Sequence, residues 1–401
     1  MISYVLIILI FRGFKSYGGT FVKHDVDKVI IVLDPRGLSN SSGSDVIKRH
    51  NVYGENLYNL NSKFKLVVIS SGDSNSVSIQ KLDFLEVYRI STPTFNSYKF
   101  GRLAANCIIN KKWKVELLIA GDPWESYWSA FFLNRFMSWN TPIQLQIHGD
   151  IANPVWREIN LRNWFRYYLA KISIPRASSI RAVSNYQAQN LIDTFGIKKQ
   201  NLDVIPVPIN IIGNNLTTNS KRPISIGFVG RIHTDRGIWK LVKLVERLDA
   251  VSDDFIVVIA GTGQEKDKFL QKISVVIPNT RIIYLGHLSE SELRKVWRKI
   301  GVLVSMAPAE SYGRVMRESL IAGVPVWATA SAGVKDLMNN CKKGEVKILD
   351  LSKSNASLDK DFKSLLKTKV SSGFSRKFIK ENNTYALKLA NSWINTINKA
   401  K

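Results

Sequence analysis

The sequence predicts an α/β protein made of two doubly wound domains. Short β-rich apolar runs recur along its 401 residues, and an amphipathic stretch of helix length follows each of them. The runs are apolar on both faces, which is typical of parallel strands covered by helices on both sides. The whole pattern occurs twice, and the chain is longer than one hydrophobic core usually serves. Two domains, each with its own parallel sheet, therefore account for the pattern best.

Ten runs have the length and composition of strands. In the first half they are 28–34, 64–70, 115–121, 142–149 and 179–184. In the second half they are 224–230, 254–261, 281–286, 301–306 and 325–329. Ligands of such sheets bind at the carboxyl ends of the strands, so with two domains facing each other we expect the site in the cleft between them.

The N-terminal stretch MISYVLIILIF is apolar from Tyr4 to Phe11. It is shorter than the roughly 20 residues of a spanning helix, and no basic segment precedes it as in a signal peptide. A core segment and an interfacial anchor both remain open. Only eight residues separate Gly19 from Lys28. A parallel crossover needs about a dozen, so the first strand is expected at 28–34.

The composition limits the partners. Lys and Arg number 57 against 32 Asp and Glu, a formal net charge of +25. Such a field attracts nucleic acid, anionic lipid or phosphorylated substrates. The two cysteines are too few for a disulfide framework or a zinc cluster and fit a reduced compartment. The pair Asp25 and Asp27 has the spacing of a metal site but precedes a strand instead of following one, so no metal is expected.

The first stretch with chemical content is GFVGRIHTDRGIWKLVKLVERL, residues 227–248. Here a strand is predicted to end at Gly230, and a loop with Arg231 and Arg236 leads into a helix. Two guanidiniums beside a helix start can hold a diphosphate, because the helix dipole and the unpaired N–H groups add to their attraction. A solvated basic loop is the alternative.

The second stretch is ESYGRVMRE, residues 310–318. A helix is expected from about Gly313 to Gly323, with Glu310 before it and Glu318 within it. On a continuous helix the two glutamates would be roughly 12 Å apart. That is more than the roughly 5–5.5 Å of a retaining glycosidase pair. Different roles for the two carboxylates are therefore favoured.

These motifs resemble the family-4 retaining glycosyltransferases of GT-B fold, in which two Rossmann-like domains face each other. The family has two glutamates separated by seven residues, as Glu310 and Glu318 are, and Arg231 matches its conserved arginine. Arg236 stands where the family usually has lysine, which keeps the charge and changes the geometry. The similarity continues in IAGTGQEKDKFL, YLGHLSESEL and AGVPVWAT, and in the first half in GDPWESYWSAFFL, LQIHGD and IRAVSNYQAQNL.

The resemblance implies a role for each matching residue. Glu310 is expected to face the donor sugar and Glu318 to hold the ribose hydroxyls. Gly230 ends the strand at the site, and backbone amides near Tyr312, Gly313 and Arg314 are expected to support the sugar or the diphosphate. Arg231 and Arg236 would neutralise the leaving diphosphate. His148, in the HGD motif, is expected near the sugar, and Gly43 would contact donor phosphate or acceptor, although the usual double glycine is absent.

The composition predicts the domain limits, and the resemblance implies a reaction. The Pro-, Asn-, Thr- and Gly-rich stretch 206–223 predicts the boundary. We expect an extension at 1–26, an acceptor domain at 27–210, a donor domain at 211–380 and a helix at 381–401 that returns to the first domain. The expected reaction transfers a hexose from a UDP- or GDP-sugar to a lipid-linked or polysaccharide acceptor in cell-envelope glycan synthesis, with retention and without a metal or other cofactor. The expected location is cytoplasmic, at the inner face of the membrane.

Residues 153–181 interleave five aromatic residues with six Lys or Arg residues. This pattern suits a membrane–water interface, single-stranded nucleic acid, or a helix with one face packed on its own domain. For a glycosyltransferase, anionic phospholipid bound by 153–181 and 1–15 is the simplest partner, and nucleic acid is not expected. Two other functions stay open: a sugar-nucleotide epimerase of the same fold, and a basic membrane- or nucleic-acid-binding protein with a vestigial site.

Overall fold

The computed structural model describes residues 28–39, 44–72, 77–92, 96–209 and 223–401. The expected extension at 1–26, the membrane segment at 1–15 and Gly43 lie outside these residues. The chain divides into two compact units. The first holds the described residues up to Ile147, with Leu169–Arg181 and Ala386–Lys401, and the second holds His148–Tyr168 and Ala182–Tyr385. The domain limits read from the sequence stay a prediction.

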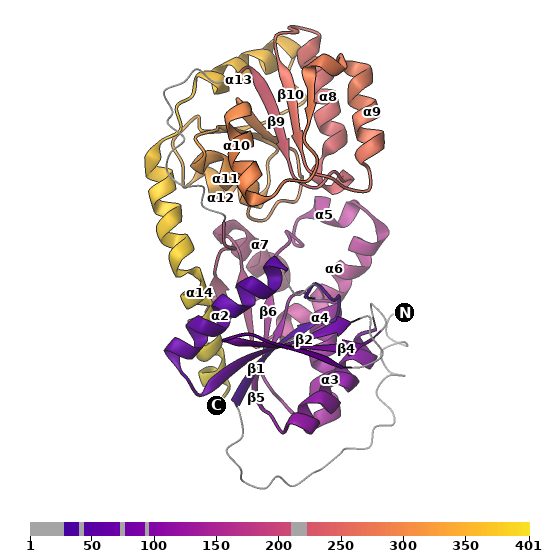
Figure 1. The fold of residues 1–401 in the computed structure, drawn as a ribbon, viewed down its shortest axis with the longest axis vertical. Helices are drawn as coiled ribbons and strands as arrows, with labels where there is room; N and C mark the ends of the chain where they lie inside the picture. Colours follow the sequence, from indigo (N-terminus) through magenta and orange to yellow (C-terminus); the bar gives the residue numbers. More distant parts are fainter. Residues whose placement is uncertain (1–27, 40–43, 73–76, 93–95, 210–222) are drawn as a thin grey trace. The chain divides into compact units, whose positions relative to one another are not determined.

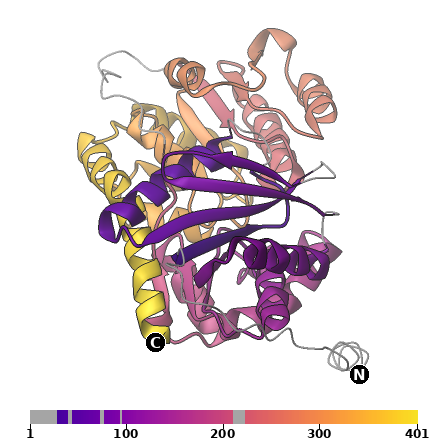
Figure 2. The same ribbon diagram turned by 60° about the horizontal axis from the view of Figure 1, so that its bottom comes forward.

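The first sheet has eight strands in the order β3-β4-β2-β1-β5-β6-β7-β8, and its indigo strands run side by side in Figure 2. From β4 to β7 neighbouring strands pair in parallel, and β3 pairs with β4 in the antiparallel direction. The strands are β1 Lys28–Asp34, β2 Phe64–Gly72, β3 Ser78–Lys81, β4 Leu85–Ser91, β5 Lys114–Ala120, β6 Ile143–Gln146, β7 Ser179–Ala182 and β8 Leu202–Val204.

Helices cover the first sheet on both faces. The chain moves outward from β1 to β2 and returns from β4 to β5, so right-handed crossovers put α2 and α3 on opposite faces, as Figure 1 shows. Ser44 caps the first turn of α2 through the Ile47 N–H. The helices of this part of the chain are α2 Asp45–Leu60, α3 Ser97–Lys111, α4 Glu125–Met137, α5 Pro154–Glu158, α6 Leu161–Ser173 and α7 Asn185–Phe195, with short 3-10 turns η2 Ile174–Arg176 and η3 Lys199–Asn201.

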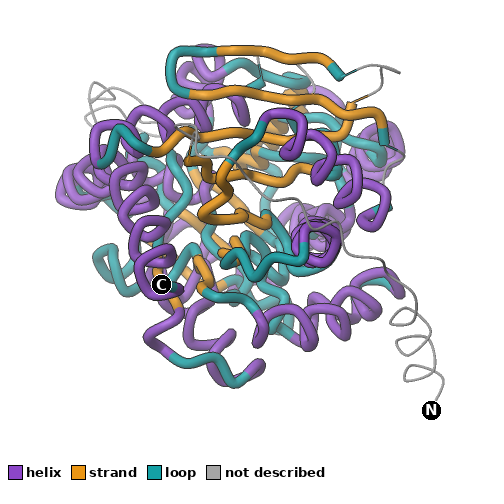
Figure 3. The backbone as a smooth tube through the Cα atoms, turned by 90° about the horizontal axis from the view of Figure 1, so that it is seen from below, coloured by secondary structure: helices purple, strands orange, loops and turns teal. Residues whose placement is uncertain are grey.

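The second sheet has six strands in the order β11-β10-β9-β12-β13-β14, all paired in parallel. Figure 3 draws the strands of both sheets in orange among the purple helices. Buried aliphatic and aromatic side chains fill both faces of this sheet, which explains why its strands read as continuous apolar runs. The strands are β9 Ser225–Val229, β10 Ile256–Ala260, β11 Ile282–Tyr284, β12 Val302–Ser305, β13 Val326–Ala328 and β14 Val346–Ile348.

The helices of the second sheet also lie on two faces. The chain steps outward from β9 to β11 and then crosses back to β12, which separates α8 and α9 from α11 and α12. The helix predicted after Gly313 is confirmed as α11. The elements are α8 Ile238–Asp249, α9 Lys266–Val276, α10 Glu290–Val296, α11 Arg314–Ile321, α12 Ala332–Met338, α13 Asn355–Lys367 and α14 Ser372–Ala400, with 3-10 turns η4 Thr234–Arg236, η5 Asn279–Arg281 and η6 Trp297–Lys299.

The last residues of α14 belong to the first unit. The Trp393 side chain is fully buried there and meets the Tyr53 ring edge-on, at 6.1 Å between centroids. The Gln144 side-chain amide on β6 donates to the Ser392 hydroxyl at 2.9 Å, and the Ser179 and Thr396 hydroxyls lie 2.7 Å apart. The end of the chain is therefore part of the core of the first unit.

Candidate functional site

A pocket of about 240 Å³ opens in the second unit at the carboxyl ends of β9 and β12. These two strands are neighbours at the point where the strand order reverses, which is where open α/β sheets bind ligands. The lining combines strand ends with the loop and first turn of α11. It consists of Phe228, Val229, Gly230, Arg231, Arg236, Leu303, Val304, Ser305, Ala307, Glu310, Gly313, Arg314, Val315 and Met316.

The two arginines of the GFVGRIHTDRG stretch line this pocket together. Arg231 Nη2 lies 2.6 Å from Asp235 Oδ2, and Arg236 Nη1 donates to Glu310 Oε2 at 3.0 Å. Both arginines keep much of their side chains in solvent, so an anionic ligand can reach them without displacing packed groups. The α8 helix follows after Gly237, as predicted from the sequence.

Glu310 occupies the loop in front of α11. Its Oε1 accepts hydrogen bonds from the backbone N–H groups of Tyr312, at 3.3 Å, and Gly313, at 3.0 Å. Gly313 has φ +75°, a left-handed conformation that glycine adopts without strain, and it is the N-cap of α11. In the structure, the amides expected to support the donor therefore hold the Glu310 carboxylate.

Glu318 lies on α11 and is buried. Arg314 Nε donates to its Oε1 at 3.0 Å, and Arg314 itself lines the pocket while Glu318 does not. Tyr312 is also buried and outside the lining. The structure thus brings Gly230, both site arginines, Glu310, Gly313 and Arg314 to one pocket, and it places Glu318 and Tyr312 behind them.

His148 follows β6 by two residues, is exposed, and belongs to the second unit. Its carbonyl accepts a hydrogen bond from the Ser311 hydroxyl at 2.5 Å, which places it beside the chain neighbour of Glu310. The next carbonyl, of Gly149, accepts from the Gln187 side chain at 2.8 Å. The HGD stretch is therefore attached to the Glu310 loop and to α7, although His148 does not line the pocket.

Sequence reasoning missed two buried charged residues near this site. Asp150 is fully buried, burial raises the pKa of its carboxyl, and the Asn153 side chain donates to it at 3.2 Å. Arg317 is buried on α11 beside Glu318 and pairs with Asp336. Asp150 could have been noticed as the third residue of HGD. Nothing in the sequence marks Arg317, because Lys and Arg are frequent throughout this chain.

No group of three or more His, Cys, Asp or Glu that could hold a metal ion occurs within the described residues. In the same residues, no helix has both the length and the hydropathy needed to cross a membrane.

Two family models match the chain, one after the other. Residues 60–211 match "Glycosyltransferase Family 4", and residues 214–383 match "Glycosyl transferases group 1". The chain belongs to the group 1, family-4 glycosyltransferases. The resemblance read from the sequence is thereby confirmed, and the second match contains every predicted site residue from Gly230 to Glu318.

Curated relatives of this family member match it over limited segments. The GDP-mannose-dependent alpha-mannosyltransferase of Mycolicibacterium smegmatis is 30% identical over 31% of this chain and 30% of its own length. The 2-deoxystreptamine N-acetyl-D-glucosaminyltransferase of Streptomyces fradiae is 21% identical over 42% and 43%. The 2-deoxystreptamine glucosyltransferase of Streptomyces kanamyceticus is 24% identical over 40% and 42%. The chain thus spans less than half the length of these three relatives.

Solved structures resemble this family member over most of its length. The lipopolysaccharide outer core galactosyltransferase WaaB has a TM-score of 0.66 at 13% identity, covering 93% of this chain and 100% of that one. Sucrose-phosphate synthase from Thermosynechococcus elongatus has a TM-score of 0.66 at 15% identity, covering 91% and 98%. Anabaena HepE in complex with UDP and glucose has a TM-score of 0.59 at 16% identity, covering 90% and 98%. These likenesses confirm the GT-B fold with two Rossmann-like sheets.

Proposed function

We propose that this protein is a retaining glycosyltransferase that moves a hexosyl group from a nucleoside diphosphate sugar to a glycan or glycolipid acceptor of the cell envelope. The observation that carries the proposal is the pocket between β9 and β12, where Arg231 and Arg236 converge with Glu310 at the start of α11. Two guanidiniums suit a diphosphate, and a carboxylate suits sugar hydroxyls. The relatives named for GDP-mannose and the structure containing UDP and glucose support UDP- and GDP-sugars as donors.

The donor's parts can be assigned to residues of the site. Arg231 and Arg236 bind the diphosphate, and Glu318 holds the ribose after Arg314 turns away from it. Glu310 exchanges its bond to Arg236 for the sugar hydroxyls, which frees the guanidinium for phosphate. The Tyr312 and Gly313 amides, now bonded to Glu310, are then available to the sugar or the diphosphate. Donor binding therefore replaces contacts within the protein by contacts with the ligand.

The reaction itself needs few groups from the protein. The bond between the anomeric carbon and the leaving phosphate oxygen breaks while an acceptor hydroxyl attacks from the same face, and the leaving phosphate takes the proton of that hydroxyl. The configuration is thereby retained. Arg231 and Arg236 stabilise the charge that develops on the diphosphate, a contribution that is usually large in such transfers. His148 lies near the transferred sugar. The reaction is proposed to run without a metal, so activity in excess EDTA should equal that without it.

The activity test begins with the donor. Thermal shift with UDP, GDP and ADP identifies the nucleotide, and a screen of the corresponding sugars identifies the donor. NMR of the product then reads the anomeric configuration. Glu318→Ala should weaken nucleotide binding, whereas Glu310→Ala should mainly lower turnover. Stabilisation by no nucleotide, together with no transfer from any donor, would contradict the proposed function; an inverted product would contradict retention alone.

The proposed acceptor and location are linked to α6. One face of this helix is buried through Tyr167 and Ala170, and the η2 turn that follows is buried at Ile174. On the opposite face Leu161 is 79% and Phe165 is 63% exposed. An α-helix turns by about 100° per residue, so the apolar stripe of this face also includes three further exposed side chains, those of Trp164, Tyr168 and Leu169. Cationic residues flank the stripe: Arg162 and Arg166 lie on one side of it and Lys171 lies on the other. An apolar stripe between cations is typical of a helix that lies in an anionic membrane surface.

We therefore propose a peripheral location at the inner face of the membrane, where α6 meets anionic phospholipid. Flotation with vesicles of neutral lipid and with vesicles that contain acidic lipid tests this directly. Phe165→Ser should reduce flotation with acidic vesicles. Val275→Ser is the matched control, because Val275 is an exposed apolar residue of α9 at 81% exposure. Equal flotation with both lipids, or equal loss in both variants, would refute the assignment to α6.

A further inference from the structure

A buried arginine lies directly behind the Glu310 loop. Arg317 is 1% exposed, and its Nη2 donates to Asp336 Oδ2 at 2.8 Å. Among the described residues, its Nε and Nη1 have no hydrogen-bond acceptor. A buried cation usually has its hydrogen-bonding groups satisfied, because desolvation without compensation is costly. The position of Arg317 therefore calls for an explanation beyond the ion pair.

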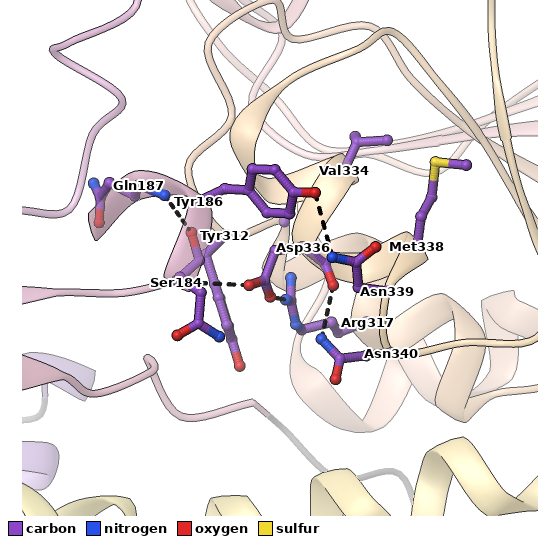
Figure 4. Close-up of polar contacts among 12 residues, drawn as sticks. Ser184, Tyr186, Gln187, Tyr312, Arg317, Val334, Asp336, Met338, Asn339 and Asn340 are labelled. Atoms are coloured by element: carbon purple, nitrogen blue, oxygen red, sulfur yellow. Dashed lines mark hydrogen bonds and ion pairs between the residues drawn. The ribbon is translucent and has the colours of Figure 1, made fainter. Parts of the chain in front are cut away.

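The guanidinium of Arg317 lies against aromatic rings. Its Cζ is 3.7 Å from the centroid of the Tyr312 ring and 5.3 Å from that of Phe378. Figure 4 shows Tyr312, Arg317 and Asp336 grouped together, with the ion pair drawn as a dashed line. A planar guanidinium attracts the face of an aromatic ring and fixes the ring's orientation more narrowly than an aliphatic side chain could.

Asp336 anchors this pair to a third helix. Its Oδ1 accepts the backbone N–H of Asn185, the first residue of α7, at 3.1 Å. Nearby, the Asn339 side chain donates to the Tyr186 hydroxyl at 3.3 Å (Figure 4). Arg317 on α11 is thus tied through Asp336 on α12 to the start of α7, so the guanidinium has a fixed support.

The loop before α11 lies on this support. The Tyr312 ring stacks on Arg317, and the preceding carbonyl, of Ser311, accepts a hydrogen bond from the Ser184 hydroxyl at 2.7 Å. The Tyr312 N–H and its neighbour, the Gly313 N–H, bind the Glu310 carboxylate. A rotation or shift of the Tyr312 ring would therefore move these two amides and the Glu310 carboxylate that they bind, and Glu310 and Gly313 line the pocket.

We propose that Arg317 is a positioning residue of the donor site, which holds the Tyr312 ring and thereby keeps Glu310 and the Tyr312 and Gly313 amides in the geometry that sugar transfer requires. The inference rests on the proposed function. Well-packed apolar residues of similar volume often replace a buried ion pair without loss of stability. Stability alone therefore does not explain a cation here, whereas a requirement for one ring orientation does.

The test separates positioning from folding. Arg317→Met combined with Asp336→Asn removes both charges, and the new asparagine can still accept the Asn185 N–H. Arg317→Lys keeps the charge and the ion pair but loses the planar stack. Arg247→Met is the control, because Arg247 is a part-buried arginine of the same unit that bonds Asn355 at 2.7 Å and the carbonyls of Leu351 and Lys353. Melting temperature, nucleotide Kd, kcat and hydrogen exchange of peptide 308–316 are measured for each.

In the double variant, kcat should fall about tenfold to a hundredfold, since misplacement of catalytic groups by about 1 Å has effects of that size. Nucleotide Kd should stay within about twofold, because Arg231 pairs with Asp235 and Glu318 with Arg314, and neither of these pairs is changed. Exchange in peptide 308–316 should be faster. Arg317→Lys should shift kcat and exchange in the same direction, and it replaces the double variant if that protein does not fold. Arg247→Met should change the melting temperature alone.

Three outcomes would overturn the inference. One is a folded double variant with wild-type kcat and wild-type exchange in 308–316. Another is a loss of kcat that Arg247→Met reproduces at equal melting temperature. The third is Arg317→Lys indistinguishable from wild type in kcat and exchange. If the proposed function is wrong, the wild-type protein transfers no sugar. Faster hydrogen exchange of peptide 308–316 in the variants would then still show that Arg317 holds the Glu310 loop, and unchanged exchange would refute that role of Arg317.

Discussion

Gly333→Ala should move the Glu310 loop without otherwise disturbing the fold. Gly333 lies in α12, and its N–H donates to the Glu310 carbonyl at 2.7 Å. A Cβ at this position would lie 2.8 Å from the backbone N and C of Tyr312 and 3.0 Å from the Glu310 carbonyl oxygen. Its φ is outside the left-handed region, so alanine fits the backbone conformation and the only conflict is steric.

The size of the effect follows from these distances. Ordinary van der Waals contact begins at 3.4 Å, so the loop must retreat by about 0.6 Å. Overpacking of this kind lowers the free energy of unfolding by about 1–3 kcal/mol, and the higher helix propensity of alanine relative to glycine raises it by about 1 kcal/mol. A net loss of about 0–2 kcal/mol lowers Tm by at most about 8 °C. Turnover should fall about tenfold, because misplacement by about 1 Å can cost a hundredfold.

The assay compares kcat, nucleotide Kd and Tm of Gly333→Ala with those of wild type. Gly121→Ala is the matched control, because the nearest atom to its new Cβ, the Ser126 Oγ, is 4.0 Å away and the Gly121 φ is also outside the left-handed region. The steric explanation is refuted if the kcat of Gly333→Ala and the kcat of Gly121→Ala both stay within about twofold of wild type. It is also refuted if Gly121→Ala loses as much activity as Gly333→Ala.

Three further outcomes are expected. Trp393→Ala should lower the free energy of unfolding by about 3–5 kcal/mol in urea titration, because the side chain is fully buried, and a loss below about 1 kcal/mol would contradict its core position. Burial alone would raise the pKa of Glu86, but hydrogen bonds, foremost from Lys65, bring the pKa of this carboxyl below its ordinary 4.5. The contact therefore stabilises the fold at pH values above 4.5, and this stability is lost as the pH falls through the lower pKa of the folded state. Lys65→Met should accordingly lower the free energy of unfolding at pH 7, and progressively less below about pH 4. Gly237→Ala should lower Tm more than Gly344→Ala, since both have positive φ but only Gly237 would place Cβ against a carbonyl oxygen, at 2.2 Å.

The strands that sequence reasoning found are those with continuous apolar runs. It missed β4, Leu85–Ser91, because Glu86 and Arg89 interrupt the run. In the fold both charges have partners: Lys65 Nζ lies 2.7 Å from Glu86 Oε1, and the Arg89 guanidinium donates to the Ser39 carbonyl. Partners so distant in sequence leave no local signal. The strand predicted at 142–149 is also too long, because β6 ends at Gln146.

The grouping of the candidate site residues at one pocket could be predicted to the extent that they lie next to strand ends. Gly230 and Arg231 follow β9, and Glu310 and Gly313 precede α11, so strand and helix signals place them at one edge of a sheet. The sequence could not tell that Glu310 binds the Gly313 amide and Arg236 in the same structure, because these bonds depend on the turn that the loop takes.

The sequence by itself determined the periodic elements, the two-sheet fold and the family, because these depend on residue spacing along the chain. Only the tertiary structure decided which side chains support the site. Arg317 meets Asp336 across 19 residues, and Asp336 meets Asn185 across 151. A buried charge is tolerated only where packing delivers its partner, so the position of such a pair is a property of the packed helices and not of any local stretch.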